Sequence, residues 1–210
     1  MKKTTILIVL ALLCLKFAGS AQESTIIPIL KNSTVKPLQI GQEVPRNLWK
    51  FQFHTMDTAS QKKAVKLSDY KGQLIILDFW SAWCGPCIRS LKKIDTIQHH
   101  FKDKMKVMML TRDPQSVFEE FQLNSKYAKG ISLSFYKEDP WLCALFPHLS
   151  ISHVIIIDST GKIRAITSSK FITMASIESI INGHPVELPV KNDFMKPNIS
   201  AKTDPKKLAP

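Results

Sequence analysis

The 210-residue sequence has few glycines, few cysteines and a shortage of acidic residues, and it contains no long apolar run. Its 7 glycines follow no repeating period, which excludes a collagen-like chain. The longest apolar run covers residues 6–15. A membrane-spanning helix needs about 20 residues, so a multi-span membrane protein is excluded. Hydrophobic residues make up 44% of the chain, which is enough for a packed core and excludes wholesale disorder.

Basic residues outnumber acidic ones, 29 to 17, and the formal net charge is +12. The positive residues are scattered among acidic and apolar ones instead of forming an arm or a helical stripe. This pattern argues against nucleic-acid binding. We interpret the charge as a solvated basic surface that helps solubility and attracts acidic partners.

The N-terminal segment has the pattern of an export signal. Residues 1–3 carry positive charge, residues 6–15 are apolar, and residues 18–21 are the small residues that a signal peptidase requires. We expect cleavage after Ala21. The predicted location is therefore outside the cytoplasm, in the periplasm, with membrane association if the signal is retained.

The composition of the remaining chain changes toward its C-terminal end. Five of the twelve prolines lie after residue 184, without an amphipathic repeat, which predicts irregular structure there. The expected parts are a signal peptide at residues 1–21, a leader at residues 22–40, a folded domain at residues 41–184 and an irregular tail at residues 185–210.

The middle part alternates strand patterns with helix patterns. A near-continuous apolar run at 74–80 predicts a strand buried on both faces, and apolar residues at three- or four-residue steps predict a helix over 88–101. The sum is an α/β domain in which helices flank a central mixed β-sheet. Further expected elements are strands at 106–110 and 131–136, helices at 114–123, 139–146 and 173–181, and hairpin strands at 153–157 and 162–168.

Cys84 and Cys87 are separated by two residues at the junction of the first strand and helix. This spacing occurs in redox pairs, zinc sites, haem attachment motifs and structural disulfides. Haem attachment requires a histidine where Ile88 stands, and a zinc site requires a second close pair, whereas only Cys143 remains. A disulfide of this short span stabilises a fold weakly. We therefore favour dithiol chemistry with no cofactor and no metal.

The helix N-terminus suggests a role for each residue of this motif. The unpaired N–H groups and the positive end of the helix dipole favour a thiolate on Cys84, the predicted nucleophile. Cys87, one turn into the helix, is the predicted resolving thiol. Pro86 stiffens the loop. Trp83 offers an apolar face to a substrate, with plain packing as the alternative.

Asp78 is a carboxylate inside an apolar strand, where desolvation raises its pKa. We interpret it as the acceptor of the Cys87 proton, either directly or through water. The alternative is a structural carboxylate bonded to a lysine or to backbone donors. Cys143, in an apolar segment, is expected to be a buried and inert thiol.

Residues 78–87, with the sequence DFWSAWCGPC, resemble the active-site segment of thioredoxin, including the aspartate six positions before the first cysteine. Gly41, Pro45 and residues 67–72 resemble the lead-in of exported TlpA/ResA-type thiol-disulfide oxidoreductases. This resemblance implies a thioredoxin fold over about residues 40–184. It also implies a reductase outside the cytoplasm, a membrane thiol protein as electron donor, and disulfide-containing exported clients such as apocytochromes.

The sequence departs from this family at one position. Such proteins carry a cis-proline just before the strand expected at 153–157, where Ser152 stands. The bond between Ile151 and Ser152 is left open as trans, or as cis held by its surroundings. By this resemblance Ile151 and Ser152 are candidate substrate-binding residues. His153 is expected to pack in its strand, although with Ser152 it could alter the pKa of Cys84 or admit a metal.

The predicted function is therefore reduction of protein disulfides by Cys84 and Cys87. A disulfide oxidant or isomerase would use the same two residues at another reduction potential. The sequence also leaves open a non-enzymatic thioredoxin-fold binding module and, more weakly, a peroxidase.

Overall fold

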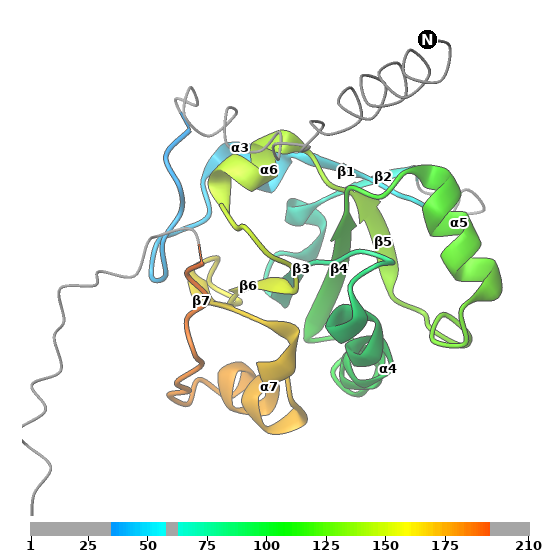
Figure 1. Ribbon diagram of the computed structural model, residues 1–210. Helices are drawn as coiled ribbons and strands as arrows, with labels where there is room; N and C mark the ends of the chain where they lie inside the picture. Colours follow the sequence, from blue (N-terminus) through cyan, green and yellow to red (C-terminus); the bar gives the residue numbers. More distant parts are fainter. Residues whose placement is uncertain (1–34, 58–62, 194–210) are drawn as a thin grey trace, which may run out of the picture. The chain divides into compact units, whose positions relative to one another are not determined.

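The computed structural model describes residues 35–57 and 63–193, which lie in one structural unit (Figure 1). The expected signal peptide lies outside the described residues, as do most of the leader and residues 194–210. Residues 185–193 contain no helix or strand. Within the described part of the chain, no helix is both long enough and apolar enough to cross a membrane.

The centre of the fold is a mixed sheet of five strands. The strands are β3 (Leu74–Phe79), β4 (Met105–Thr111), β5 (Ser134–Lys137), β6 (His153–Ile157) and β7 (Ile163–Thr167). Their order is β5-β4-β3-β6-β7. The pairs β3–β4 and β4–β5 are parallel, whereas β3–β6 and β6–β7 are antiparallel. All six residues of β3 are buried, so the expected central strand is confirmed.

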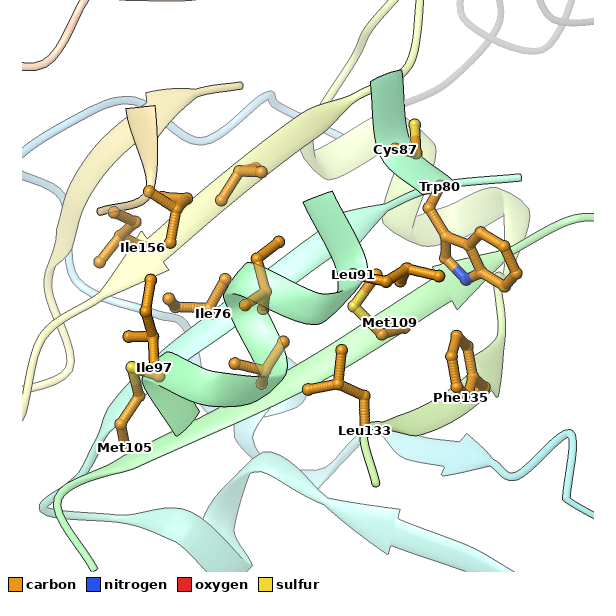
Figure 2. Packing of buried hydrophobic residues seen from close by; sticks show 14 of the residues in the cluster. Ile76, Trp80, Cys87, Leu91, Ile97, Met105, Met109, Leu133, Phe135 and Ile156 are labelled. Atoms are coloured by element: carbon orange, nitrogen blue, oxygen red, sulfur yellow. The ribbon is translucent and has the colours of Figure 1, made fainter. Parts of the chain in front are cut away.

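Helices cover both faces of this sheet, as predicted. One face carries α4 (Gly85–His100), α5 (Gln115–Asn124) and α7 (Met174–Ile181), and the other carries α3 (Arg46–Lys50), the 3-10 helix η1 (Leu67–Tyr70) and α6 (Pro140–Leu145). Figure 2 shows Leu91 and Ile97 of α4 packed over Ile76 and Met109 of the sheet. Side chains alternate along a strand, so Asp78 lies on the same face as Ile76.

Local capping signals set several of the boundaries. Asp139 accepts a hydrogen bond from the N–H of Trp141 at 2.7 Å and begins α6, as expected. Thr173 caps α7 in the same way. Gly161 has a φ of 89° in the turn between β6 and β7, a conformation that glycine adopts without strain.

The structure differs from the sequence prediction in several elements. The strands β1 (Gln52–His54) and β2 (Ala64–Lys66) form a separate antiparallel pair where no element was expected, and α3 was also missed. Each strand has three residues, which is too short to show a period. The strand expected at 131–136 is confined to β5. The helix after the cysteine motif begins at Gly85 because Cys84 caps it, and α5 begins one residue after Pro114.

Candidate active site

Cys84 and Cys87 lie at the N-terminus of α4, directly after β3 and a short loop. Cys84 is the N-cap, and its Sγ accepts a hydrogen bond from the N–H of Cys87 at 3.3 Å. A disulfide joins the two residues, whose Cα atoms are 5.2 Å apart. Cys84 keeps 8% of its surface exposed and Cys87 keeps none. The expected placement is confirmed: the first sulfur is at the helix end and the second is shielded. Their chemical roles stay predictions.

The loop before Cys84 is held by Asp113, a buried residue that the sequence did not indicate. Asp113 accepts hydrogen bonds from the hydroxyl of Ser81 at 2.8 Å and from the N–H of Ala82 at 2.7 Å. The N–H of Cys84 in turn donates to the carbonyl of Ser81 at 3.0 Å. The signal that could have found Asp113 is topological. Parallel β3 and β4 end at the same edge of the sheet, so the residues that follow them meet there.

Asp78 is fully buried on the face of β3 that α4 covers. Burial raises its pKa to about 8, and the positive charge of Lys93 acts in the opposite direction. The expected rise in pKa is thus confirmed. Neither carboxylate oxygen has a hydrogen-bond partner among the described residues. The structure therefore does not show the alternative of a carboxylate bonded to lysine or backbone donors. Its role as a proton acceptor stays a prediction.

The loop before β6 contains two of the candidate substrate-binding residues, Ile151 and Ser152, and it places their side chains in different surroundings. The peptide bond between Ile151 and Ser152 is cis. The side chain of Ile151 is 37% exposed. The buried hydroxyl of Ser152 instead donates to Oγ of Ser169 at 2.7 Å and accepts from the N–H of Ser169 at 2.8 Å. Ile151 is therefore accessible to a partner, whereas the Ser152 side chain points inward. Contact of either residue with a substrate stays a prediction.

Trp83 projects from the surface beside the cysteines, with 79% of its surface exposed. Together with Phe121 and Tyr127 it lines a cavity of about 410 Å³ between the start of α4 and α5. Pro86 is exposed in the first turn of α4. An aromatic side chain this exposed does not serve as core packing, so the interpretation of Trp83 as a face for a substrate is favoured over the packing alternative.

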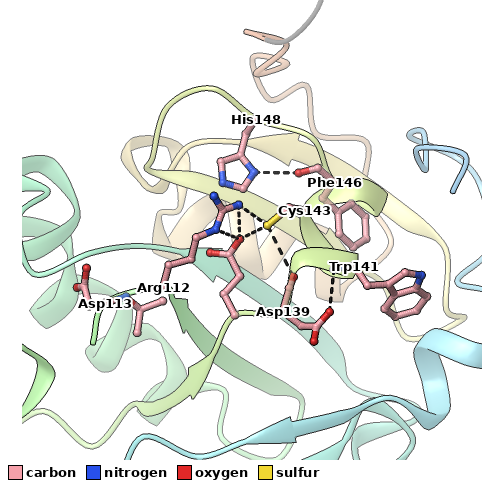
Figure 3. A network of polar contacts seen from close by, with 9 residues as sticks. Arg112, Asp113, Asp139, Trp141, Cys143, Phe146 and His148 are labelled. Atoms are coloured by element: carbon pink, nitrogen blue, oxygen red, sulfur yellow. Dashed lines mark hydrogen bonds and ion pairs between the residues drawn. The ribbon is translucent and has the colours of Figure 1, made fainter. Parts of the chain in front are cut away.

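Cys143 is a free and buried thiol, as expected, but its surroundings are not apolar. Its Sγ contacts the guanidinium of Arg112 and the carboxylate of Glu138, which form an ion pair at 2.8 Å (Figure 3). Arg112 directly follows β4 and Glu138 directly follows β5, and the fold brings both against α6. Burial and the nearby Glu138 raise the pKa of Cys143 to about 12, so the thiol stays protonated. A protonated thiol is a poor nucleophile, which agrees with an inert role.

His153 packs in β6 against Phe79 and stacks on His148, with ring centroids 4.6 Å apart. Burial lowers the pKa of His153 to about 3, so its ring is neutral. Within the described part of the chain, no group of three or more His, Cys, Asp and Glu residues is arranged to hold a metal. The structure thus supports a packing role for His153.

A protein-family model matches most of this domain. Its description is "AhpC/TSA family", and the match covers residues 40–166, which is more than half of the chain. The chain belongs to the AhpC/TSA family. This assignment agrees with the resemblance to thioredoxin-like redoxins that the cysteine motif carries.

Relatives of this AhpC/TSA protein include thioredoxin from Griffithsia pacifica, 46% identical over 41 residues, which cover 20% of this chain and 38% of that protein. The thiol-disulfide oxidoreductase ResA of Bacillus cereus is 26% identical over 86 residues, covering 40% of this chain and 45% of ResA. The chain thus spans less than half the length of these curated relatives.

A solved structure confirms the predicted thioredoxin fold. It is the thioredoxin domain of a thiol-disulfide oxidoreductase from Bacteroides vulgatus, which superposes with a TM-score of 0.53 at 18% identity. The match covers 69% of this chain and 99% of that domain. The likeness to ResA-type redoxins is therefore supported by family, sequence and fold.

Proposed function

We propose that this AhpC/TSA family protein is an exported thiol-disulfide oxidoreductase that reduces disulfides of client proteins through Cys84 and Cys87. One observation carries the proposal. Cys84 caps α4 and keeps 8% of its surface exposed, and the fully buried Cys87 is joined to it by a disulfide. A pair in this arrangement can alternate between a dithiol and a disulfide, with one sulfur open to a partner and the other protected.

The reaction has two exchange steps. In the reduced protein, the Cys84 thiolate attacks one sulfur of a client disulfide, whose S–S bond breaks as the first client sulfur leaves as a thiolate. Cys87 then loses its proton and attacks Sγ of Cys84. The mixed disulfide breaks, the Cys84–Cys87 disulfide forms, and the second client sulfur leaves as a thiolate. Two electrons pass from the dithiol to the client.

Asp78 acts as the general base and then the general acid of the second step. Its carboxylate takes the proton of Cys87 as that sulfur attacks, and the resulting carboxylic acid returns a proton to the leaving client thiolate. The pKa of Asp78 is about 8, close to the value of about 8.5 for an ordinary thiol. Proton transfer between groups of similar pKa costs little in either direction.

A disulfide-reduction assay on insulin tests the proposal. Cys84→Ser is expected to abolish activity, because no mixed disulfide can form. Cys87→Ala is expected to stop after the first step and leave the client attached to Cys84, which mass spectrometry detects. Cys143→Ser serves as the matched control and should retain the rate. If Cys84→Ser reduces insulin at the wild-type rate, catalysis by this pair is wrong and a non-enzymatic binding module is favoured.

The direction of electron flow is tested by the reduction potential of the Cys84–Cys87 couple. Thioredoxin, a reductant, lies at about −270 mV, and the oxidant DsbA lies at about −120 mV. We expect a value below about −200 mV. A value near that of DsbA would contradict the reductant role and favour the oxidant or isomerase.

The proposed clients are exported proteins with disulfides, and the proposed electron donor is a thiol protein of the membrane. The signal pattern of residues 1–21 supports export, and the resemblance of the cysteine segment to TlpA/ResA-type redoxins supports the proposed clients and donor. Expressing Cys87→Ala in the native host should accumulate mixed disulfides in the extracytoplasmic fraction. Mixed disulfides confined to cytoplasmic proteins would contradict export.

A further inference from the structure

A series of hydrogen bonds connects the loop before β6 to helix α4. Ser152 exchanges two hydrogen bonds with Ser169, which begins the 3-10 helix η2 (Ser169–Phe171). The carbonyl oxygens of Ser169 and Lys170 accept hydrogen bonds from Nζ of Lys93 at 2.8 and 3.4 Å. Both serines are buried, with 7% and 2% of their surfaces exposed. Proline at position 152 could not form this connection, because it has no hydroxyl.

Lys93 is the charged group that acts on Asp78. Its ammonium stabilises the ionised carboxylate and thereby lowers the pKa of Asp78, against the larger effect of burial. Burial lowers the pKa of Lys93, and Asp78 raises it. The neighbouring strands place Met109 and Val154 in register with Asp78, and neither titrates. Lys93 itself comes from α4, and the same helix contributes Cys87 to this side of the core.

We propose that Ser152 and Lys93 are positioning residues for the resolving step. Ser152 fixes η2, the carbonyls of η2 fix the ammonium of Lys93, and Lys93 sets how readily Asp78 takes the proton of Cys87. The inference rests on the proposed function. In this inference Ser152, at the position of the usual cis-proline, acts on the proton acceptor Asp78 through η2 and Lys93. The loop that exposes Ile151 is thereby linked to the proton-transfer step.

Stopped-flow reaction of the reduced full chain with 5,5′-dithiobis(2-nitrobenzoate) separates the two exchange steps. Attack by Cys84 releases the first nitrothiobenzoate thiolate, and attack by Cys87 on the mixed disulfide releases the second. Both phases are recorded from about pH 6 to about pH 10. Because the pKa of Asp78 is about 8, the rate of the second phase in the wild type is expected to change slope near that pH.

Lys93→Met should move the inflection of the second phase to higher pH by about one unit, because the ionised Asp78 loses its stabilising charge. Lys93→Arg retains the charge and should bring the inflection back toward the wild-type value. Ser152→Ala should move it in the same direction as Lys93→Met by a smaller amount, and Ser152→Thr, which keeps the hydroxyl, should restore it. In the two Lys93 variants the first phase should remain unchanged.

The matched control is Lys92→Met, which removes an exposed lysine of the same helix that lies 3.9 Å from Asp95. It should leave the inflection in place. The inference is wrong if Lys93→Met and Ser152→Ala, both shown to be folded by circular dichroism, keep the wild-type inflection. That result would leave the proposed function intact. Absence of the first phase in the wild type would instead overturn the proposed function.

Discussion

Asp78 is a carboxylate that the fold buries completely without a hydrogen-bond partner among the described residues. Its pKa is about 8 in the folded protein, against an ordinary value of 3.8. Between these values the folded state holds a proton that the unfolded state has released. The stabilising contribution of this proton is complete below pH 3.8 and is lost as the pH rises through 8. A group that costs stability at neutral pH is better explained by chemistry than by packing.

Replacing Asp78 by Asn tests this pH dependence. The amide does not ionise, so the free energy of unfolding of Asp78→Asn, relative to the wild type, should rise between pH 4 and pH 8 by at least about 1 kcal/mol. Urea denaturation at the two pH values measures this difference. The exposed Asp103→Asn is the control and should show no such rise. An equal effect of Asp78→Asn at both pH values would contradict the account.

Trp83 should matter to a protein client and little to the fold. Because 79% of its surface is exposed, Trp83→Ala should change the free energy of unfolding by less than about 0.5 kcal/mol. We expect insulin reduction to fall severalfold, while reaction with 5,5′-dithiobis(2-nitrobenzoate) is unchanged. Leu123→Ala on α5, at a residue that is 77% exposed, is the matched control. Equal rates of Trp83→Ala and wild type with insulin would exclude Trp83 from client contact.

At the scale of elements, the site depends on how the loop between β3 and α4 is held. Asp113 is anchored just beyond β4, and its two carboxylate oxygens each accept one hydrogen bond from the loop. The loop conformation in turn places Cys84 at the helix N-terminus. The cysteine pair is therefore positioned by two parallel strands and one carboxylate, in addition to its own helix.

Asp113→Ala should loosen this loop. The hydroxyl of Ser81 and the N–H of Ala82 would lose their partner, which costs about 1 to 3 kcal/mol of stability when the groups stay buried. We expect faster hydrogen exchange at the Ala82 amide and a slower first phase with 5,5′-dithiobis(2-nitrobenzoate). Asp103→Ala, at an exposed position, should change neither. Unchanged exchange at Ala82 in Asp113→Ala would show that the carboxylate does not hold the loop.

Elements with long patterns could be predicted from the sequence, and short ones could not. The apolar run of β3 and the three- to four-residue spacing in α4 are strong local signals. The three-residue strands β1 and β2 have no period of their own, and they exist because they pair with each other. The expected strand at 131–136 was too long because only residues 134–137 pair with β4.

At the scale of the whole described domain, two buried histidines and Asp78 have opposite effects on how the free energy of unfolding changes with pH. Burial lowers the pKa of both His148 and His153, and that of His153 falls to about 3 from 6.5. The unfolded state therefore binds a proton that the folded His153 does not. The contribution of neutral His153 to the free energy of unfolding is therefore complete above pH 6.5. It is lost progressively as the pH falls from 6.5 toward 3.

His153→Phe should reduce this acid sensitivity. Relative to the wild type, the free energy of unfolding of the variant should rise by about 2 kcal/mol between pH 7 and pH 5, because the unfolded variant no longer gains that proton. Guanidinium denaturation at both pH values provides the measurement. His54→Phe, at an exposed site on β1, should show no rise. If the two variants respond alike, His153 does not carry the acid sensitivity.

The candidate site could be predicted in part. Cys84, Cys87 and Asp78 could be placed because they are neighbours along one strand and helix. The sequence could not indicate Asp113, Lys93 or the polar surroundings of Cys143. The contacts of Ser81 with Asp113, Lys93 with Ser169 and Arg112 with Cys143 join residues more than 30 positions apart. They depend on which strand ends and helices meet.

The central claim, that Cys84 is the attacking sulfur, is tested most directly by alkylation of the reduced protein at pH 7. Peptide mass spectrometry follows the reaction of each cysteine with iodoacetamide. Cys84 caps the helix and keeps 8% of its surface exposed, whereas Cys87 keeps none, and burial and Glu138 raise the pKa of Cys143 to about 12. Cys84 should therefore react at least about tenfold faster than either of the other two. Faster alkylation of either Cys87 or Cys143 would contradict the account.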